Sequence, residues 1–221
     1  PAKGESQVHA YLYGRLPEII DNGKGDREVI AAPRGEGKST LVSTIFLLWC
    51  VVTGREHLIV LIMDAALQAA VMMEAAKAEL EINPRLAMDY REATGQGRVW
   101  QVGMIITAND VKVQAFGKGK RVRGLRHGPH RVGLVLLDDI ENDEHVKSPE
   151  QRDKDMSWLT KTVLSLGPPD GSMDVVYIGT VLHYDSVLSR FLKNPLWKAR
   201  LFQAVITWPE NMALWDQWEE L

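Results

Sequence analysis

The sequence contains a single cysteine, Cys50, and no apolar run long enough to cross a bilayer. Cys50 lies in the apolar stretch 45–52, and a lone cysteine cannot form an internal disulfide, so we expect a reducing compartment. The first seven residues are small and polar, without the apolar core of a signal peptide. Together these absences argue against the disulfide-rich secreted and membrane-spanning classes.

A strong overall charge is also lacking, since 26 Lys and Arg against 29 Asp and Glu give a net charge of −3. This balance gives no global signal for nucleic-acid binding. Acidic residues are absent, however, from residues 117–131, which we call the basic segment. It holds Lys118, Lys120, Arg121, Arg123, Arg126 and Arg131. The basic segment predicts a local patch of positive charge in a slightly acidic protein.

Apolar runs alternate with helix-forming stretches along the 221 residues. Buried strands are predicted at 28–32, 58–63, 133–137, 174–179 and 201–207, and a hairpin at 102–107 and 111–116. Helices are predicted at 8–21, 38–52, 64–82, 149–166 and 186–192, with Asp64 as the cap of the third. This order predicts an α/β fold with a mostly parallel sheet flanked by helices on both faces. We expect one domain over 1–221, with an N-terminal helical segment (1–27) and a Trp-rich C-terminal tail (208–221). The tryptophans of this tail are expected to belong to a core or an interface; they are Trp208, Trp215 and Trp218.

The segment Ala-Pro-Arg-Gly-Glu-Gly-Lys-Ser at 32–39 follows a predicted strand and opens a predicted helix. It matches the G-x-x-x-x-G-K-[ST] phosphate-loop pattern except that Ala32 replaces the first glycine. Glycines let backbone N–H groups approach phosphate oxygens, and the helix N-terminus adds free donors and a favourable dipole. We therefore expect ATP to bind here, with Lys38 on the β and γ phosphates and Ser39 on Mg²⁺. The expected binding residues are Pro33, Arg34, Gly35, Glu36, Gly37, Lys38, Ser39 and Thr40.

Acidic side chains follow the predicted strand 133–137. Asp138 is expected to bind Mg²⁺ through water, and the next acidic residue, Asp139, to polarise the attacking water as general base. Glu141 is the alternative base, because Asp is one methylene shorter than the Glu usually used. The strand 58–63 and the hairpin separate the two motifs along the chain, which indicates the RecA-like class of phosphate-loop ATPases with an additional strand between them.

Three further features each have two or more interpretations. Arg34 is either an arginine finger that reaches the γ-phosphate of its own site or a solvent-facing side chain that offsets Glu36. Thr180, at the carboxyl end of strand 174–179, is either a γ-phosphate sensor or a polar strand terminus. The basic segment contacts DNA phosphates, supplies an arginine to a neighbouring subunit's ATP site, or is a solvated loop.

Four motifs in order carry a family resemblance. They are Pro-Arg-Gly-Glu-Gly-Lys-Ser-Thr at 33–40, Arg-Val-Arg-Gly-Leu-Arg-His-Gly at 121–128, Leu-Leu-Asp-Asp-Ile-Glu-Asn-Asp at 136–143 and Ile-Gly-Thr-Val-Leu-His-Tyr-Asp at 178–185. From about His9 to Trp215 the chain resembles the ATPase (motor) domain of a tailed-bacteriophage terminase large subunit. The resemblance implies ATP hydrolysis that moves viral double-stranded DNA into a preformed capsid. The alternative is a helicase-like or other nucleic-acid-remodelling ATPase, although a helicase core would need a second similar domain.

The resemblance also implies roles for single residues. Arg34 matches the arginine of the family's phosphate loop, and Gly179-Thr180 matches its coupling motif. Arg123 or Arg126 falls where some members carry an arginine that acts in trans on the next subunit, and His9 is a candidate for adenine contact. The implied partners are DNA, the portal protein and the small terminase subunit, within a homo-oligomeric ring on the capsid in the host cytoplasm. The isolated chain is expected to be a monomer without nuclease activity, because it ends before the family's nuclease domain could fit.

Overall fold

The computed structural model of the chain describes residues 6–208 and 210–219. Within them, eight strands form one sheet in the order β3-β4-β5-β2-β6-β7-β1-β8. The strands are β1 (Arg27–Ala31), β2 (Leu58–Met63), β3 (Val99–Trp100), β4 (Met104–Ile106), β5 (Lys112–Gly117), β6 (Leu134–Asp138), β7 (Asp174–Gly179) and β8 (Lys198–Leu201). Neighbouring strands from β5 to β8 are parallel, whereas β4 is antiparallel to both β3 and β5.

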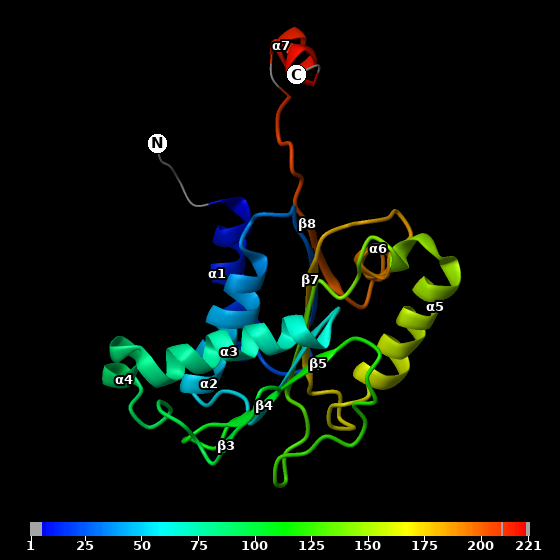
Figure 1. Cartoon of the computed structure of the whole chain (residues 1–221). Helices are drawn as coiled ribbons and strands as arrows, with labels where there is room; N and C mark the ends of the chain where they lie inside the picture. The colour runs from blue at the N-terminus through cyan, green and yellow to red at the C-terminus, as the bar shows by residue number, and fades with distance from the viewer. Residues whose placement is uncertain (1–5, 209, 220–221) are drawn as a thin grey trace.

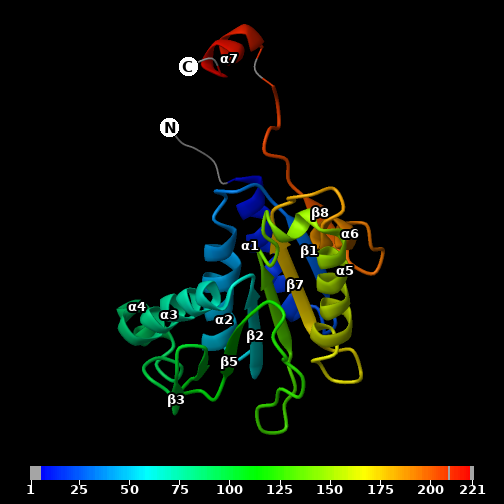
Figure 2. The same ribbon diagram turned by 45° about the vertical axis from the view of Figure 1, so that its right-hand side comes forward.

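Helices cover both faces of the sheet (Figures 1 and 2). On one face lie α1 (Gln7–Asp21), the π-helical segment η1 (Thr40–Phe46), α2 (Leu47–Val52) and α3 (Ala66–Ile82), which leads into α4 (Pro84–Asp89). The other face carries α5 (Pro149–Trp158), its π-helical continuation η3 (Leu159–Val163) and α6 (Val187–Leu192), with the short 3₁₀ turn η2 (His145–Lys147) before α5. The predicted α/β architecture is thus confirmed.

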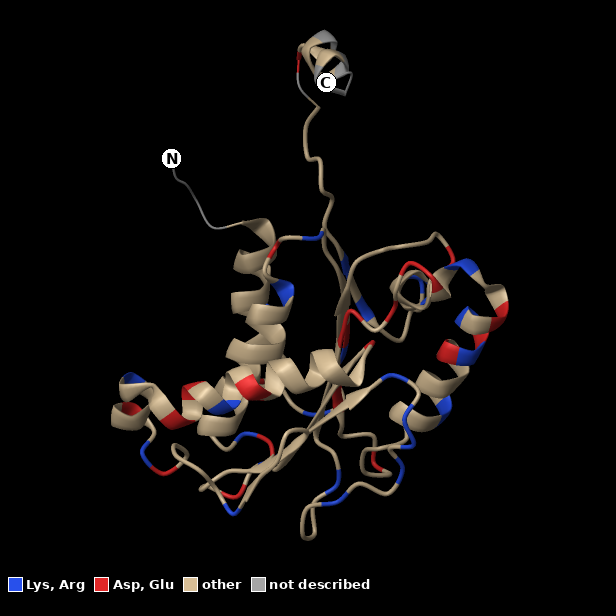
Figure 3. Ribbon diagram, in the orientation of Figure 1, with Lys and Arg blue, Asp and Glu red and all other residues tan. Residues whose placement is uncertain are grey.

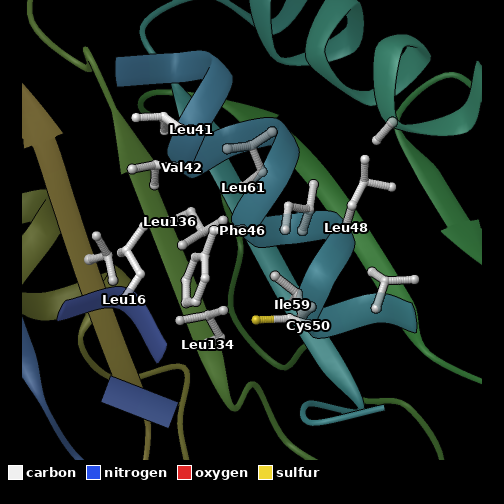
Figure 4. Close-up of a cluster of buried hydrophobic side chains, with 14 of the residues drawn as sticks. Leu16, Leu41, Val42, Phe46, Leu48, Cys50, Ile59, Leu61, Leu134 and Leu136 are labelled. Carbon is white, nitrogen blue, oxygen red and sulfur yellow. The ribbon is translucent and has the colours of Figure 1, made fainter. Parts of the chain in front are cut away.

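The core consists of two apolar layers, because successive side chains of a strand point to opposite faces of the sheet. Ile59 and Leu61 of β2 and Leu134 and Leu136 of β6 pack under α1, η1 and α2 (Figure 4). The alternate residues of the same strands pack under α5, η3 and α6. Cys50 is a free thiol within the first layer, where burial raises its pKa and keeps it protonated.

The sheet order brings distant motifs together. β2 and the β4–β5 hairpin separate β1 from β6 along the chain, but in space the strand between β1 and β6 is β7. The predicted class with an additional strand between the two motif strands is thus found, but that strand is β7, which follows both motifs in the chain, and neither β2 nor the hairpin lies between β1 and β6. The carboxyl ends of β1, β7, β6 and β2 consequently lie next to one another at one edge, which we call the carboxyl edge.

Three predicted elements have different bounds in the structure. The helix after the phosphate loop is π-helical before it becomes α2, and α3 begins at Ala66 without a cap from Asp64. The Asp64 carboxylate instead accepts a hydrogen bond from Asn142 and pairs with Lys118. The last strand is 198–201 and not 201–207, because β8 follows β1 in register and β1 ends at Ala31, where the phosphate loop begins.

The stretch after β8 leads to α7 (Met212–Glu219), which projects from the rest of the molecule in Figures 1 and 2. Trp208 and Trp215 are 64% and 46% exposed, so they do not belong to the core, and their predicted place in an interface stays a prediction. The Trp218 side chain and residues 1–5, 209 and 220–221 lie outside the described part of the structure. Among the described residues, no helix has the length and apolar character that a bilayer span requires.

Candidate active site

The phosphate loop is held between β1 and β7. Ala32 N donates to Gly179 O over 3.0 Å, so the loop starts from a fixed point at the carboxyl edge. Gly35 and Gly37 have φ of 86° and 66°, a left-handed conformation that other residues rarely adopt. His9 on α1 places Nε2 2.7 Å from Glu36 O, which ties the first helix to the loop. The backbone path of the loop therefore requires glycine at Gly37, which the pattern includes, and also at Gly35, which is a variable position of the pattern.

Lys38 lies across the ends of three strands. Its side chain is only 5% exposed, and Nζ donates to Thr180 Oγ1 over 2.9 Å and to Pro33 O over 3.2 Å. The same ammonium is 3.6 Å from Asp139 Oδ2. A single cation therefore links the phosphate loop, the end of β6 and the end of β7.

Asp138 is fully buried at the end of β6 and accepts two hydroxyl hydrogen bonds. Ser39 donates to Oδ1 over 3.1 Å and Ser43 to Oδ2 over 2.6 Å. Burial raises the pKa of Asp138 above its ordinary value, and the two hydroxyl groups partly offset this effect. Sequence reasoning missed Ser43. Its spacing of four residues from Ser39, on the same side of one helix, was the available signal.

Asp139 has a strained backbone and a half-exposed side chain. Its φ is 42°, which is uncommon for a residue other than glycine and is typical of functional sites. Asp139 N donates to Ile178 O, and Oδ1 accepts from Thr180 N, both over 3.0 Å. Oδ2 accepts no hydrogen bond among the described residues and lies on the side of Lys38. One carboxylate oxygen thus fixes the side chain while the other is left for a further group.

Both carboxylate oxygens of Glu141 already accept hydrogen bonds. Oε1 accepts from Val187 N over 2.7 Å, and Oε2 accepts from Leu188 N over 2.8 Å and from the Tyr177 hydroxyl over 3.1 Å. The carboxylate therefore anchors the first turn of α6 to the loop after β6. Burial, followed by the charge of Glu141, raises the pKa of Tyr177, so the phenol stays a hydrogen-bond donor.

A cavity of about 520 Å³ opens beside these groups. Its polar wall includes Arg34, Ser39, Asp139 and Thr180, and its apolar wall comes largely from α3, with Leu67, Val71 and Met72. Glu141, Asn142 and Asp143 complete the rim. The Arg34 guanidinium donates to Asp143 Oδ2 over 2.8 Å, and both side chains are mostly exposed. The structure thus brings the predicted phosphate-loop, acidic and Thr180 residues to one place.

The basic segment is divided in the structure. Lys118 is only 6% exposed and paired with Asp64 and Asp155, so its inclusion in a surface patch is wrong. Arg123 and Arg126 are exposed and are not among the residues that line the cavity. Figure 3 shows several Lys and Arg positions along the loop that follows β5. Arg126 O accepts from Lys112 at the start of β5, the edge of the sheet opposite Asp138. Whether either arginine acts on a neighbouring subunit stays a prediction.

Comparisons with known proteins match the fold. No family model matches the chain, and neither does any curated protein sequence. The solved ATPase domain of the large terminase of Thermus phage P74-26 has a TM-score of 0.50 and 15% identity, over 99% of this chain and 91% of that chain. An arginine-to-alanine mutant of the same domain has a TM-score of 0.51 and 14% identity, over 97% and 90%. At this identity the likeness establishes the fold, and it agrees with the predicted RecA-like class.

Proposed function

We propose that this chain binds ATP with Mg²⁺ at the carboxyl edge and hydrolyses it to drive viral double-stranded DNA into a preformed capsid. The observation that carries the proposal is the convergence of Lys38, Ser39, Asp138, Asp139 and Thr180 from three separate strands. The solved domains of the same fold support the motor assignment, because they are named as ATPase domains of a large terminase.

The residues present fit a nucleotide and its cation. The φ angles of Gly35 and Gly37 permit the close backbone approach that a polyphosphate needs. Asp138 and Ser39 offer the oxygen ligands that Mg²⁺ prefers. Burial raises the pKa of Asp138, and Lys38 offsets only part of this rise, so a bound divalent ion would favour the ionised carboxylate. Bound Mg²⁺ would neutralise charge on the phosphates.

We assign the general base to Asp139. Its Oδ2 is available to accept a proton from water, while Oδ1 is fixed by Thr180 N. Lys38 would bind the phosphates, and its hydrogen bond to Thr180 joins phosphate binding to the end of β7. Glu141 is the weaker candidate, because removing its carboxylate from Val187 and Leu188 would release the start of α6.

The arginines complete the proposal. Arg34 lies at the cavity rim and would leave Asp143 to reach a γ-phosphate in cis. In the alternative, Arg123 or Arg126 would act on the next subunit of a homo-oligomeric ring. An exposed arginine of the basic segment that does not do so would contact DNA phosphates. The ring would dock on the portal protein and receive DNA from the small terminase subunit.

Replacing the phosphate-loop lysine tests the central claim. We expect Lys38→Ala to lower steady-state ATP hydrolysis by more than about 100-fold, because a buried charge aimed at the phosphates is lost. The matched control is Lys161→Ala, an exposed lysine on η3 far from the site in sequence. Unchanged hydrolysis in Lys38→Ala would refute the proposal. Because a shared site needs the assembled ring, hydrolysis is measured with portal and DNA present, and packaging is measured as DNA protected from nuclease.

Mixing experiments decide which arginine completes the site. If an arginine acts in trans, Lys38→Ala subunits mixed with Arg123→Ala or Arg126→Ala subunits should regain part of the activity, because intact pairs of half-sites form. If neither mixture regains activity while the subunits assemble, Arg34 is the better candidate.

A further inference from the structure

A buried lysine lies behind the proposed site. The Lys118 ammonium is 3.1 Å from Asp64 Oδ1 and 3.0 Å from Asp155 Oδ2, and it is 3.3 Å from His145 Nδ1. These groups come from three places: the end of β2, the helix α5 and the turn before α5. Burying a lysine costs free energy unless its charge is paired. The carboxylates of Asp64 and Asp155 supply that pairing for the Lys118 ammonium.

The cluster reaches the loop that carries the proposed base. Asp64 Oδ2 accepts a hydrogen bond from Asn142 Nδ2 over 2.8 Å, and Asn142 lies three residues after Asp139. Asn142 Oδ1 accepts from Glu144 N over 3.1 Å and from His145 N over 2.8 Å. A continuous chain of contacts therefore runs from Lys118 through Asp64 to the loop 139–145.

The backbone at Lys118 is fixed independently of its side chain. Lys118 N donates to Met63 O over 2.8 Å, which extends the β5–β2 pairing by one residue. A Cβ at Gly117 would come within 2.5 Å of Ala66 N, so β5 lies directly against the start of α3. The ammonium is thus anchored to the sheet, while Asn142 belongs to a loop that has no strand partner of its own.

We propose that Lys118 is a positioning residue for ATP hydrolysis, acting through Asp64 and Asn142 to hold the loop 139–143 against the carboxyl edge. Lys118 does not line the cavity, whereas Asp64 and Asn142 do, so its effect on the site passes through these two residues. It neutralises Asp64 and thereby keeps the acceptor for Asn142 in place. The catalytic consequence depends on the proposed function, whereas the effect on the loop does not.

Kinetics of three variants test the catalytic consequence. We expect Lys118→Met to lower kcat by about 10- to 100-fold with a much smaller change in KM, because a small displacement of the base costs rate more than binding. Lys118→Arg, which keeps the charge, should restore most of the rate. Asn142→Ala should match Lys118→Met, and the double variant should be no worse than either single one, because both break the same chain. The control Lys154→Met removes an exposed lysine of α5 next to Asp155.

Hydrogen exchange tests the structural step without using activity. Lys118→Met should speed amide exchange in 139–145 and leave the amides of β6 protected, whereas Lys154→Met should change neither. If Lys118→Met fails to fold, the same measurement on Asn142→Ala and Lys118→Arg replaces it. The proposal is overturned if amide exchange in 139–145 is unchanged in Lys118→Met, or if its KM rises as much as its kcat falls. It is also overturned if the loss of kcat in the double variant equals the sum of the two single losses in free energy. A wild-type chain that does not hydrolyse ATP with portal and DNA present would refute the proposed function. The exchange result would still test whether Lys118 holds the loop in place.

Discussion

The carboxyl edge and the exposed part of the basic segment are both rich in charge, but their charged side chains differ in how many contacts they make within the chain. At the edge, Lys38, Asp138 and Glu141 each accept or donate at least two hydrogen bonds within the chain. Arg123 and Arg126, in contrast, form no ion pair with any residue that the structure describes. The comparison teaches that charged groups at the carboxyl edge are held in place by contacts within the chain, whereas the arginine side chains of the basic segment have no ion pair among the described residues.

The largest expected effect is the loss of turnover in Asp139→Asn, which tests whether the carboxyl edge carries out hydrolysis. Asp139→Asn keeps the size of the side chain and an oxygen for Thr180 N but removes the basic oxygen. We expect turnover to fall by about 10³-fold while ATP binding survives, as loss of a general base predicts. Steady-state hydrolysis and calorimetric binding of a non-hydrolysable analogue measure the two quantities. Turnover that persists in Asp139→Asn but is abolished in Glu141→Gln would reverse the two assignments.

The next effect is on stability. Glu141→Gln exchanges a charged acceptor of two backbone N–H groups for an amide, so it should lower the free energy of unfolding by about 1.5–3 kcal/mol. Turnover below the melting temperature should fall far less than in Asp139→Asn. Denaturant unfolding gives the free energy, and Glu144→Gln, an exposed residue in the same loop, is the control. Equal stability of the two variants would show that Glu141 is not an anchor.

A smaller effect is expected from the basic segment. Arg123→Ala and Arg126→Ala should each weaken DNA binding and reduce the slope of log affinity against log salt by about one, if each arginine contacts one phosphate. The melting temperature should hardly change, because no ion pair within the described chain is lost. Fluorescence anisotropy with duplex DNA over a range of salt measures the slope, with the exposed Arg85→Ala as control. A lower melting temperature with an unchanged slope would show that these arginines stabilise the fold and do not contact DNA phosphates.

The smallest effect is the pH dependence contributed by Asp185, which follows β7. Hydrogen bonds from Arg190 and Arg152 hold the pKa of this carboxyl well below its usual value. Its stabilising contribution is therefore complete above the ordinary pKa of about 4 and is lost as the pH falls through the folded-state pKa. Thermal unfolding should show the largest Tm difference between wild type and Asp185→Asn near neutral pH, and the difference should shrink below about pH 4. A difference independent of pH would contradict the ion-pair explanation.

Local patterns in the sequence were sufficient to locate the phosphate loop and the acidic strand end. Gly37, Lys38 and Ser39 follow a buried strand, and Asp138 follows another, because parallel strands in such a sheet place their ligands at their carboxyl ends. Contacts between segments far apart in the chain were not predictable in this way. Ser43 had a helical spacing as its only signal, and the pairing of Lys118 with Asp64 and Asp155 left no trace in composition or periodicity.

The sequence by itself determined an α/β chain with a phosphate loop and two acidic candidates for one role, because strand periodicity, glycine placement and helix starts are local properties. The tertiary structure decided that β7 lies between β1 and β6, which carries Thr180 to Lys38 and Asp139. It also decided that Asp139 keeps a free oxygen whereas Glu141 is used to anchor α6. Those outcomes depend on which strands pair and which backbone N–H groups need an acceptor, and such pairing exists only once the chain has folded.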